Sequence, residues 1–153
     1  MPTYVCSVSP GSLTAQQKEQ IAKGITRVHT EATGAPAYFV QVIIAERAAS
    51  ELYLGGTPAA PNHIYIRGDI RAGRTHAQRE HLMLAMLETL STIAAVDPTS
   101  VWINLCNLEP TDMIEYGHVL PGSGREQEWF DNLPKSLQTY LITLGTKANS
   151  FTL

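Results

Sequence analysis

Pro2 directly follows Met1, and a proline at this position raises a chemical question. Proline fixes φ and has no backbone N–H to donate, which does no harm at the very start of a strand. A plain strand start is therefore the simpler interpretation. The alternative is that removal of Met1 leaves Pro2 with a free secondary amine, which can act as a general acid or base inside a pocket.

Two arginines flank a glycine in RAGRT (71–75), just before an expected helix. The free N–H groups and the dipole at a helix N-terminus favour an anion. The guanidinium groups of Arg71 and Arg74 would add bidentate recognition of a carboxylate or phosphate. The simpler interpretation is a solvated loop with two surface arginines, and the sequence leaves both open.

His29 and Glu115 are the other residues whose type allows acid–base chemistry. His29 comes late in an expected helix, at the border of its apolar stripe, where a histidine is more often structural than catalytic. Glu115 lies in EPTDMIEYGHVLP, where an exposed loop glutamate is the simpler interpretation. Held near an arginine pair, a carboxylate would instead orient a water molecule or act as a base.

No motif for a metal or a cofactor is found. The chain has no Gly-rich phosphate loop, no GxSxG and no HExxH. The remaining histidines show no metal-ligand spacing with a pair of carboxylates: His63, His76, His81 and His118. We therefore expect neither a metal site nor a cofactor.

An internal repeat indicates which elements position these residues. Sliding the sequence by 61 positions places TAQQKEQI (14–21) on THAQREHL (75–82) and VQVII (40–44) on VWINL (101–105). The same offset, without a gap, places Tyr4 on Tyr65 and His29 on Leu90. A duplicated unit of about sixty residues is the expected cause.

Each unit has the pattern of a strand, a helix and a strand. The first strands are 3–8 and 64–70, and the return strands are 39–45 and 100–106. Thr14 and Thr75 are each followed by Gln three residues on, which predicts a capping box at each helix start. Gly34 is expected to end the first helix and Asp97-Pro98 the second.

Right-handed crossovers put both helices on the same side of the sheet. The predicted fold is therefore α+β: two fused βαβ units forming a four-stranded mixed sheet with two helices on one face, plus a C-terminal extension. We expect a single domain over 1–153, with repeat units 2–61 and 63–122 and the extension 123–153. The return strands are apolar on both faces, so a second copy is expected to cover the other face, and segment 107–153 to wrap a neighbour or an edge.

The bulk composition excludes several classes of protein. The 153 residues are 44% hydrophobic and 16% charged with a net charge of −3, which is typical of a globular protein and gives no footprint for nucleic acid. No segment is long and apolar enough to span a membrane and no secretory signal is evident, so we expect a cytoplasmic protein. Cys6 and Cys106 are expected to be buried thiols, although a disulfide between them is left open.

Taken together, the sequence resembles the tautomerase superfamily, and within it the cis-3-chloroacrylic acid dehalogenase group. The resemblance covers about residues 1–134. It depends on the order and spacing of several short stretches: the MP start, ITRVH (25–29), TG (33–34), QV (41–42), LGG (54–56), RAGRT (71–75), MIEYG (113–117) and EWFDNL (128–133).

The resemblance implies the tautomerase β-α-β fold, a homotrimer and a site for a small carboxylate substrate. It assigns Pro2, His29 and Glu115 to catalysis, with His29 also binding substrate beside Arg71 and Arg74. A tyrosine of the group would fall at Asn104, which can hydrogen-bond a water molecule but has no acidic hydroxyl. The implied activity is hydration or hydrolytic dehalogenation of 3-haloacrylates or related unsaturated carboxylates, in which Pro2 donates a proton.

Two other functions stay open. If the amine of Pro2 is a base, the reaction becomes keto–enol tautomerisation of a 2-oxo acid of the phenylpyruvate type. A non-enzymatic ferredoxin-like domain that binds a small ligand would also use an arginine pair at a helix N-terminus. Pro2 discriminates between these classes, because only an enzyme needs its free amine.

Overall fold

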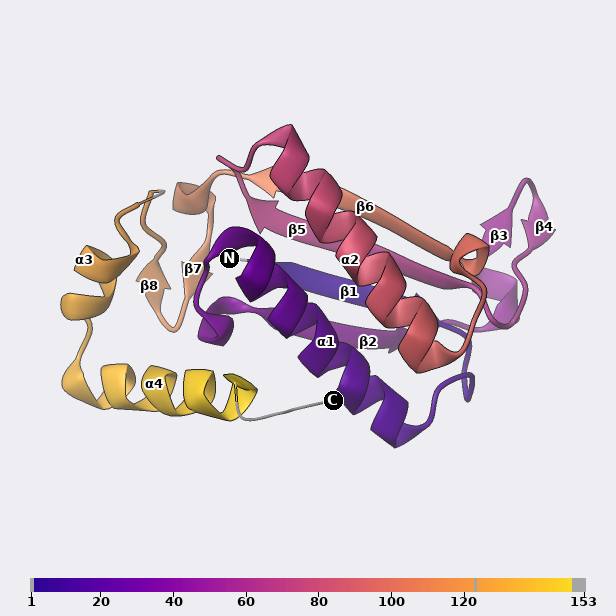
Figure 1. Ribbon diagram of the computed structural model, residues 1–153, viewed down its shortest axis with the longest axis horizontal. Helices are drawn as coiled ribbons and strands as arrows, with labels where there is room; N and C mark the ends of the chain where they lie inside the picture. The colour runs from indigo at the N-terminus through magenta and orange to yellow at the C-terminus, as the bar shows by residue number, and fades with distance from the viewer. Residues whose placement is uncertain (1, 123, 150–153) are drawn as a thin grey trace.

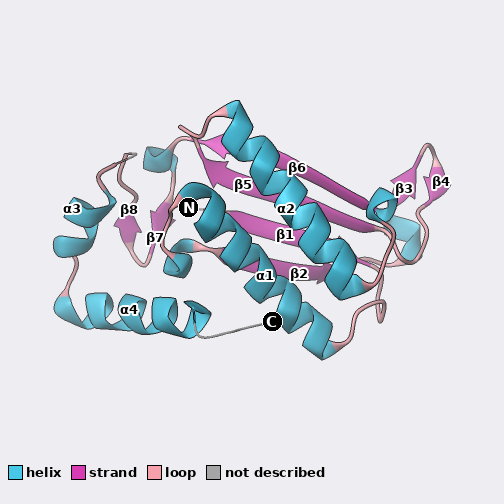
Figure 2. Cartoon of the chain, viewed as in Figure 1, coloured by secondary structure: helices cyan, strands magenta, loops and turns pink. Residues whose placement is uncertain are grey.

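The computed structural model describes residues 2–122 and 124–149, in which two long helices lie across one face of a sheet (Figures 1 and 2). The helices are α1 (Ala15–Thr33) and α2 (His76–Ala94). The sheet has four strands in the order β2-β1-β5-β6. Their bounds are β1 Thr3–Val8, β2 Gln41–Glu46, β5 Ile64–Arg71 and β6 Val101–Leu108.

The strand directions confirm the predicted α+β fold of two βαβ units. Strand β1 is parallel to β2, β5 is parallel to β6, and the two units meet where β1 and β5 pair antiparallel. The shorter elements lie in the connections and in the C-terminal part. They are η1 Ala37–Phe39, η2 Ala49–Glu51, β3 Tyr53–Leu54, β4 Thr57–Pro58, η3 Pro98–Ser100, η4 Pro110–Asp112, β7 Ile114–Glu115, β8 His118–Val119, α3 Glu126–Asp131 and α4 Lys135–Asn149.

Local capping residues fix both helix starts as the sequence predicts. The Thr14 hydroxyl accepts a hydrogen bond from the Gln17 backbone N–H at 3.1 Å, and the Thr75 hydroxyl accepts one from that of Gln78 at 3.2 Å. Gly34 ends α1 in the left-handed conformation, with φ of 71°. The prediction that Asp97-Pro98 ends the second helix is wrong by a few residues, because Ala95 already adopts a left-handed cap with φ of 54°.

The hydrophobic core fills the space between the helices and the sheet. Its fully buried side chains come from β1, β5, α1 and α2, and include Tyr4, Cys6, Ile21, Ile25, Ile66, Ile70, Leu82, Met86 and Leu90. The helices cross closely at Gly24, where a Cβ would lie 2.6 Å from Thr89 Cγ2. Both cysteines are free, Cys6 in this core and Cys106 partly buried, so the structure has no disulfide between them.

The first strands of the two units, β1 and β5, do not correspond residue by residue at the offset of 61 positions expected from the sequence. The helices and the return strands keep the offset of 61, but Tyr4 packs in the core whereas Tyr65 points to the opposite face of the sheet. The gap-free alignment of Tyr4 with Tyr65 is therefore wrong. The strand registers show a slip of one residue. Thr3 pairs with Gln41, and Trp102, which corresponds to Gln41 at the offset of 61, pairs with Tyr65, so Tyr65 corresponds to Thr3 and not to Tyr4.

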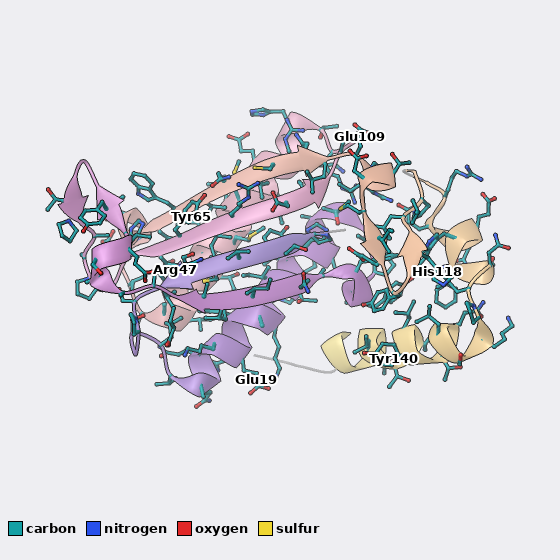
Figure 3. All side chains as sticks on the ribbon, turned by 180° about the vertical axis from the view of Figure 1, so that it is seen from behind. Glu19, Arg47, Tyr65, Glu109, His118 and Tyr140 are labelled. Atoms are coloured by element: carbon teal, nitrogen blue, oxygen red, sulfur yellow. The ribbon has the colours of Figure 1, made fainter. Side chains whose placement is uncertain are left out.

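The opposite face of the sheet carries no helix among the described residues, as Figure 3 shows from behind. Ile43 and Trp102 are 42% and 53% exposed there, so this face lacks a cover within one chain. It is not purely apolar, however, because Arg67 and Asp69 form an ion pair on it at 3.0 Å and Tyr65 pairs with Trp102 across β5 and β6.

The C-terminal part folds against its own chain rather than only against a neighbour. Helix α4 packs on η1 and α1, and α3, β7 and β8 lie beyond the end of the sheet at which β1 starts (Figure 1). This part covers the end of the sheet where the predicted site residues gather. Residues 123 and 150–153 of the expected extension lie outside the described residues. None of the described helices is both long and apolar enough to cross a membrane.

Candidate active site

The start of β1 and the end of β5 meet at one end of the sheet. Pro2 is buried there, and its carbonyl accepts a hydrogen bond from the Gln41 N–H at 3.0 Å. Thr3 pairs with Asp69 in the antiparallel register, so Pro2 lies beside the last residues of β5. Pro2 and Arg71, which are 69 positions apart in the chain, are thereby brought to the same end of the sheet.

His29 is buried and neutral at this end of the sheet. It is 1% exposed in the last turns of α1, and its Nδ1 shares a hydrogen bond of 2.7 Å with the hydroxyl of the fully buried Tyr4. Burial, reinforced by the charge of Arg74, lowers the pKa of His29 to about 3. Its Nε2 is buried and accepts or donates no hydrogen bond within the described part of the chain.

The ring of Tyr4 fits here because residue 68 is glycine. A Cβ on Gly68 would lie 2.6 Å from Tyr4 Cε1 and 2.7 Å from Leu105 Cδ2, both far inside van der Waals contact. Burial raises the pKa of the Tyr4 hydroxyl well above its ordinary value, although the nearby Arg74 charge opposes this shift. The phenol therefore stays protonated and is available as a donor to His29.

Arg71 is a buried arginine and not a surface residue of a solvated loop. Its side chain is 3% exposed, and its guanidinium donates to Glu126 Oε1 of α3 and to the Pro121 carbonyl at 3.4 Å. Its Nε is buried and donates to none of the described residues. A buried N–H without an acceptor is costly, and it favours a bound anion at this point.

Arg74 lies beside Arg71 in the connection that leads into α2. It is half-buried, and one of its Nη atoms lies 3.5 Å from the Arg71 carbonyl. Burial, together with the charge of Arg71, lowers the pKa of Arg74, while Glu126 raises it. Arg74 therefore contacts the backbone of Arg71, whose guanidinium in turn contacts Glu126.

Glu115 is partly buried in the short strand β7 rather than exposed in a loop. It lines a pocket of about 550 Å³ together with Thr3, Gln41 and Tyr116. Burial raises the pKa of the Glu115 carboxyl above its ordinary value. Because Thr3 follows Pro2 directly, Glu115 is brought to the start of β1.

Comparison with known proteins identifies the family to which this arrangement belongs. Residues 1–132 match the Tautomerase_3 family, described as "Putative oxalocrotonate tautomerase enzyme". The chain belongs to the tautomerase superfamily. No curated protein sequence matches it.

Solved structures of other tautomerase superfamily members share its fold. N1, a member of the cis-3-chloroacrylic acid dehalogenase family, is 34% identical with a TM-score of 0.89, over 92% of this chain and 99% of that chain. A fused 4-OT solved as an asymmetric trimer is 27% identical with a TM-score of 0.70, over 76% of this chain and 94% of that chain. The predicted resemblance to the tautomerase superfamily and its cis-3-chloroacrylic acid dehalogenase group is confirmed.

Asn104 is the one predicted site residue that this tautomerase superfamily chain does not bring to the others. It faces away from the core on β6, where its Oδ1 accepts a hydrogen bond from the Tyr65 hydroxyl at 2.5 Å. Its Nδ2 lies 3.6 Å from the Cys106 sulfur. Asn104 is therefore part of the uncovered face of the sheet.

The sequence analysis missed two residues that contact the candidate site, Tyr4 and Glu126. Tyr4 was treated only as a strand residue, although an aromatic hydroxyl on a buried strand needs a partner and His29 was available. Glu126 contacts Arg71 across 55 positions, which no local pattern indicates. Within the described ranges, no group of three His, Cys, Asp or Glu side chains is placed to hold a metal ion.

Proposed function

We propose that this tautomerase superfamily enzyme uses the amine of Pro2, freed by removal of Met1, for cofactor-independent hydration or hydrolytic dehalogenation of small unsaturated carboxylates such as 3-haloacrylates. The observation that carries the proposal is the convergence of a buried Pro2 with Arg71, Arg74 and a neutral His29 at one end of the sheet. The similarity to N1 supports the same reaction class.

The arginines are proposed to bind the substrate carboxylate. The buried Arg71 Nε has a hydrogen to donate, and Arg74 adds a second guanidinium beside it. A bound carboxylate would be held by charge-assisted hydrogen bonds, which are roughly twice as strong as neutral ones. Withdrawal of electron density toward these cations makes the β-carbon of an unsaturated acid more electrophilic.

His29 is proposed to act as a neutral hydrogen-bond donor. Tyr4 remains protonated and donates to Nδ1, which puts the ring hydrogen of His29 on Nε2. That N–H is the buried one without a partner in the described residues, so it is free to donate to the substrate. Tyr4 is then a positioning residue that sets the tautomer.

Glu115 and Pro2 are proposed to supply the water and the proton. Glu115 orients a water molecule that adds to the β-carbon, and the protonated amine of Pro2 gives a proton to the α-carbon. With a 3-haloacrylate, the resulting halohydrin loses hydrogen halide and leaves malonate semialdehyde. Because burial raises its pKa, Glu115 takes up the proton from that water more readily than an exposed glutamate does.

A second candidate reaction is the keto–enol tautomerisation of 2-oxo acids of the phenylpyruvate type. The observation that favours it is the burial of Pro2 at the end of the sheet that also carries Arg71 and Arg74, because burial and like charge both disfavour an ammonium ion. A neutral amine would move a proton between the enol oxygen and the carbon of the substrate. A non-enzymatic ligand-binding domain is the remaining alternative, for which Pro2 would not matter.

The oligomer is proposed to be a homotrimer that covers the open face of the sheet. The exposed Ile43 and Trp102 on that face would be buried by other copies of the chain. A fused 4-OT relative forms a trimer, which supports this state. Asn104 would then contact a neighbouring copy and could hydrogen-bond a water molecule in that copy's site.

The test is a pair of activity assays on the untagged protein with Met1 removed. We expect chloride release from cis-3-chloroacrylate or ketonisation of phenylpyruvate enol. Pro2→Ala should lower whichever of these two activities the protein shows by about a hundredfold or more. Pro10→Ala, in the exposed turn after β1, is the matched control and should retain activity. Turnover that survives Pro2→Ala would contradict the proposal, and absence of both activities would favour a binding domain.

A further inference from the structure

Glu126 is a carboxylate already present at the arginine pair. It lies at the start of α3, and the buried guanidinium of Arg71 donates a hydrogen bond to its Oε1. Its side chain is 26% exposed, so it is more buried than its neighbour Glu128, which is 58% exposed. Burial acts to raise the pKa of Glu126, but the hydrogen bond from Arg71, backbone hydrogen bonds and the charge of Arg71 together lower it.

The presence of Glu126 changes the net charge that a ligand meets. Arg71 and Arg74 carry two positive charges, and Glu126 compensates one of them. One positive charge and one buried N–H, the Nε of Arg71, are then left for a ligand. The net positive charge of Arg71, Arg74 and Glu126 together therefore compensates one carboxylate group of a ligand and not two.

We propose that Glu126 is a specificity-determining residue, which makes the site prefer ligands with one carboxylate over ligands with two by neutralising one of the two guanidinium charges. The inference rests on the proposed function, since it requires that the arginine pair binds a carboxylate. Glu126 repels the first carboxylate of every ligand to the same extent. A second carboxylate is repelled in addition, so the effect is seen in the ratio of the two affinities.

The expected size of this effect follows from Coulomb's law. Two like charges about 10 Å apart, at the effective dielectric constant of about 20 that applies near protein surfaces, change a binding constant by on the order of tenfold. Removal of the Glu126 charge should therefore improve the binding of a dicarboxylate, relative to a monocarboxylate of the same shape, by about tenfold.

The experiment measures the affinities of crotonate and fumarate by isothermal titration calorimetry. The two ligands have the same trans double bond and the same first carboxylate, and crotonate carries a methyl group where fumarate carries its second carboxylate. The variants are Glu126→Gln and Glu126→Ala, which remove the same charge with different shapes, so either one that folds tests the proposal. Glu128→Gln is the matched control, because Glu128 lies on the same helix but pairs with Arg125 at 2.8 Å.

The expected result is a shift of about tenfold in the affinity ratio toward fumarate in the Glu126 variants, with less than a twofold shift in Glu128→Gln. Equal tightening of both ligands, or the same shift in all variants, would overturn the proposal. If neither ligand binds the wild-type protein or any variant, the carboxylate site of the proposed function fails as well. The two failures are therefore distinguishable.

Discussion

The buried His29 predicts an acid-sensitive fold. An unfolded histidine has a pKa of about 6.5, whereas burial lowers the pKa of His29 in the folded protein to about 3. Between these two values the unfolded chain binds more protons than the folded one. Lowering the pH through this window therefore destabilises the fold, and stability contributed by the neutral ring is fully present only above about pH 6.5.

The magnitude follows from the size of the shift. Each pH unit inside the window lowers the free energy of unfolding by about 1.4 kcal/mol. A change from pH 7.5 to 4.5 crosses the window only below about pH 6.5, so it lowers the free energy of unfolding by about 2.5 kcal/mol through His29 alone. Solvent screening does not reduce this free energy, because the His29 ring is 1% exposed.

The assay is urea denaturation at both pH values and at a fixed protein concentration, with His29→Gln as the comparison. Glutamine does not titrate, and its amide can still accept a hydrogen bond from Tyr4. Wild type should lose about 2.5 kcal/mol more than His29→Gln over this range. His81→Gln, which replaces an exposed histidine of α2, should keep the wild-type dependence. Equal pH dependence in wild type and His29→Gln would refute the assignment of a buried, neutral histidine.

Three further substitutions test the site. Tyr4→Phe removes the 2.7 Å hydrogen bond to His29, so it should destabilise the fold in urea by about 1–2 kcal/mol and lower kcat/KM; unchanged kcat/KM would remove Tyr4 from the site. Arg71→Ala should raise KM for a carboxylate substrate by about thirtyfold, because a charged contact is worth on the order of 2 kcal/mol. Steady-state kinetics that give an unchanged KM would contradict carboxylate binding by Arg71. Gly68→Ala should destabilise the fold by about 1–3 kcal/mol in urea, because the added methyl group displaces the Tyr4 ring. Gly122→Ala is the control and should not destabilise the fold, because nothing lies within 4 Å of its added methyl group. Equal effects would mean that the close contact at Gly68 relaxes without strain.

Much of the fold could be predicted because its signals are local. The capping boxes at Thr14 and Thr75 are properties of short segments, and the structure reproduces them. The repeat then supplied the topology, since two βαβ units with right-handed crossovers leave few arrangements. The frame of β5 could not be predicted in this way, because a one-residue slip between strand and helix is set by packing across the sheet.

The site was predicted less completely than the fold, for a physical reason. Pro2, His29, Arg71, Arg74 and Glu115 were proposed as site residues by chemical type and by family resemblance. Their environments, including the Tyr4 hydroxyl on His29 and the Glu126 carboxylate on Arg71, depend on contacts between distant segments.

The most direct test of the central claim is the intact mass of the purified, untagged protein before and after incubation with 3-bromopropiolate. The proposed function predicts a mass that lacks Met1, and a single adduct that peptide mapping places on Pro2. A protein that retains Met1 and gains no adduct would contradict a free, reactive proline in a carboxylate site. Pro2 would then be only the start of β1.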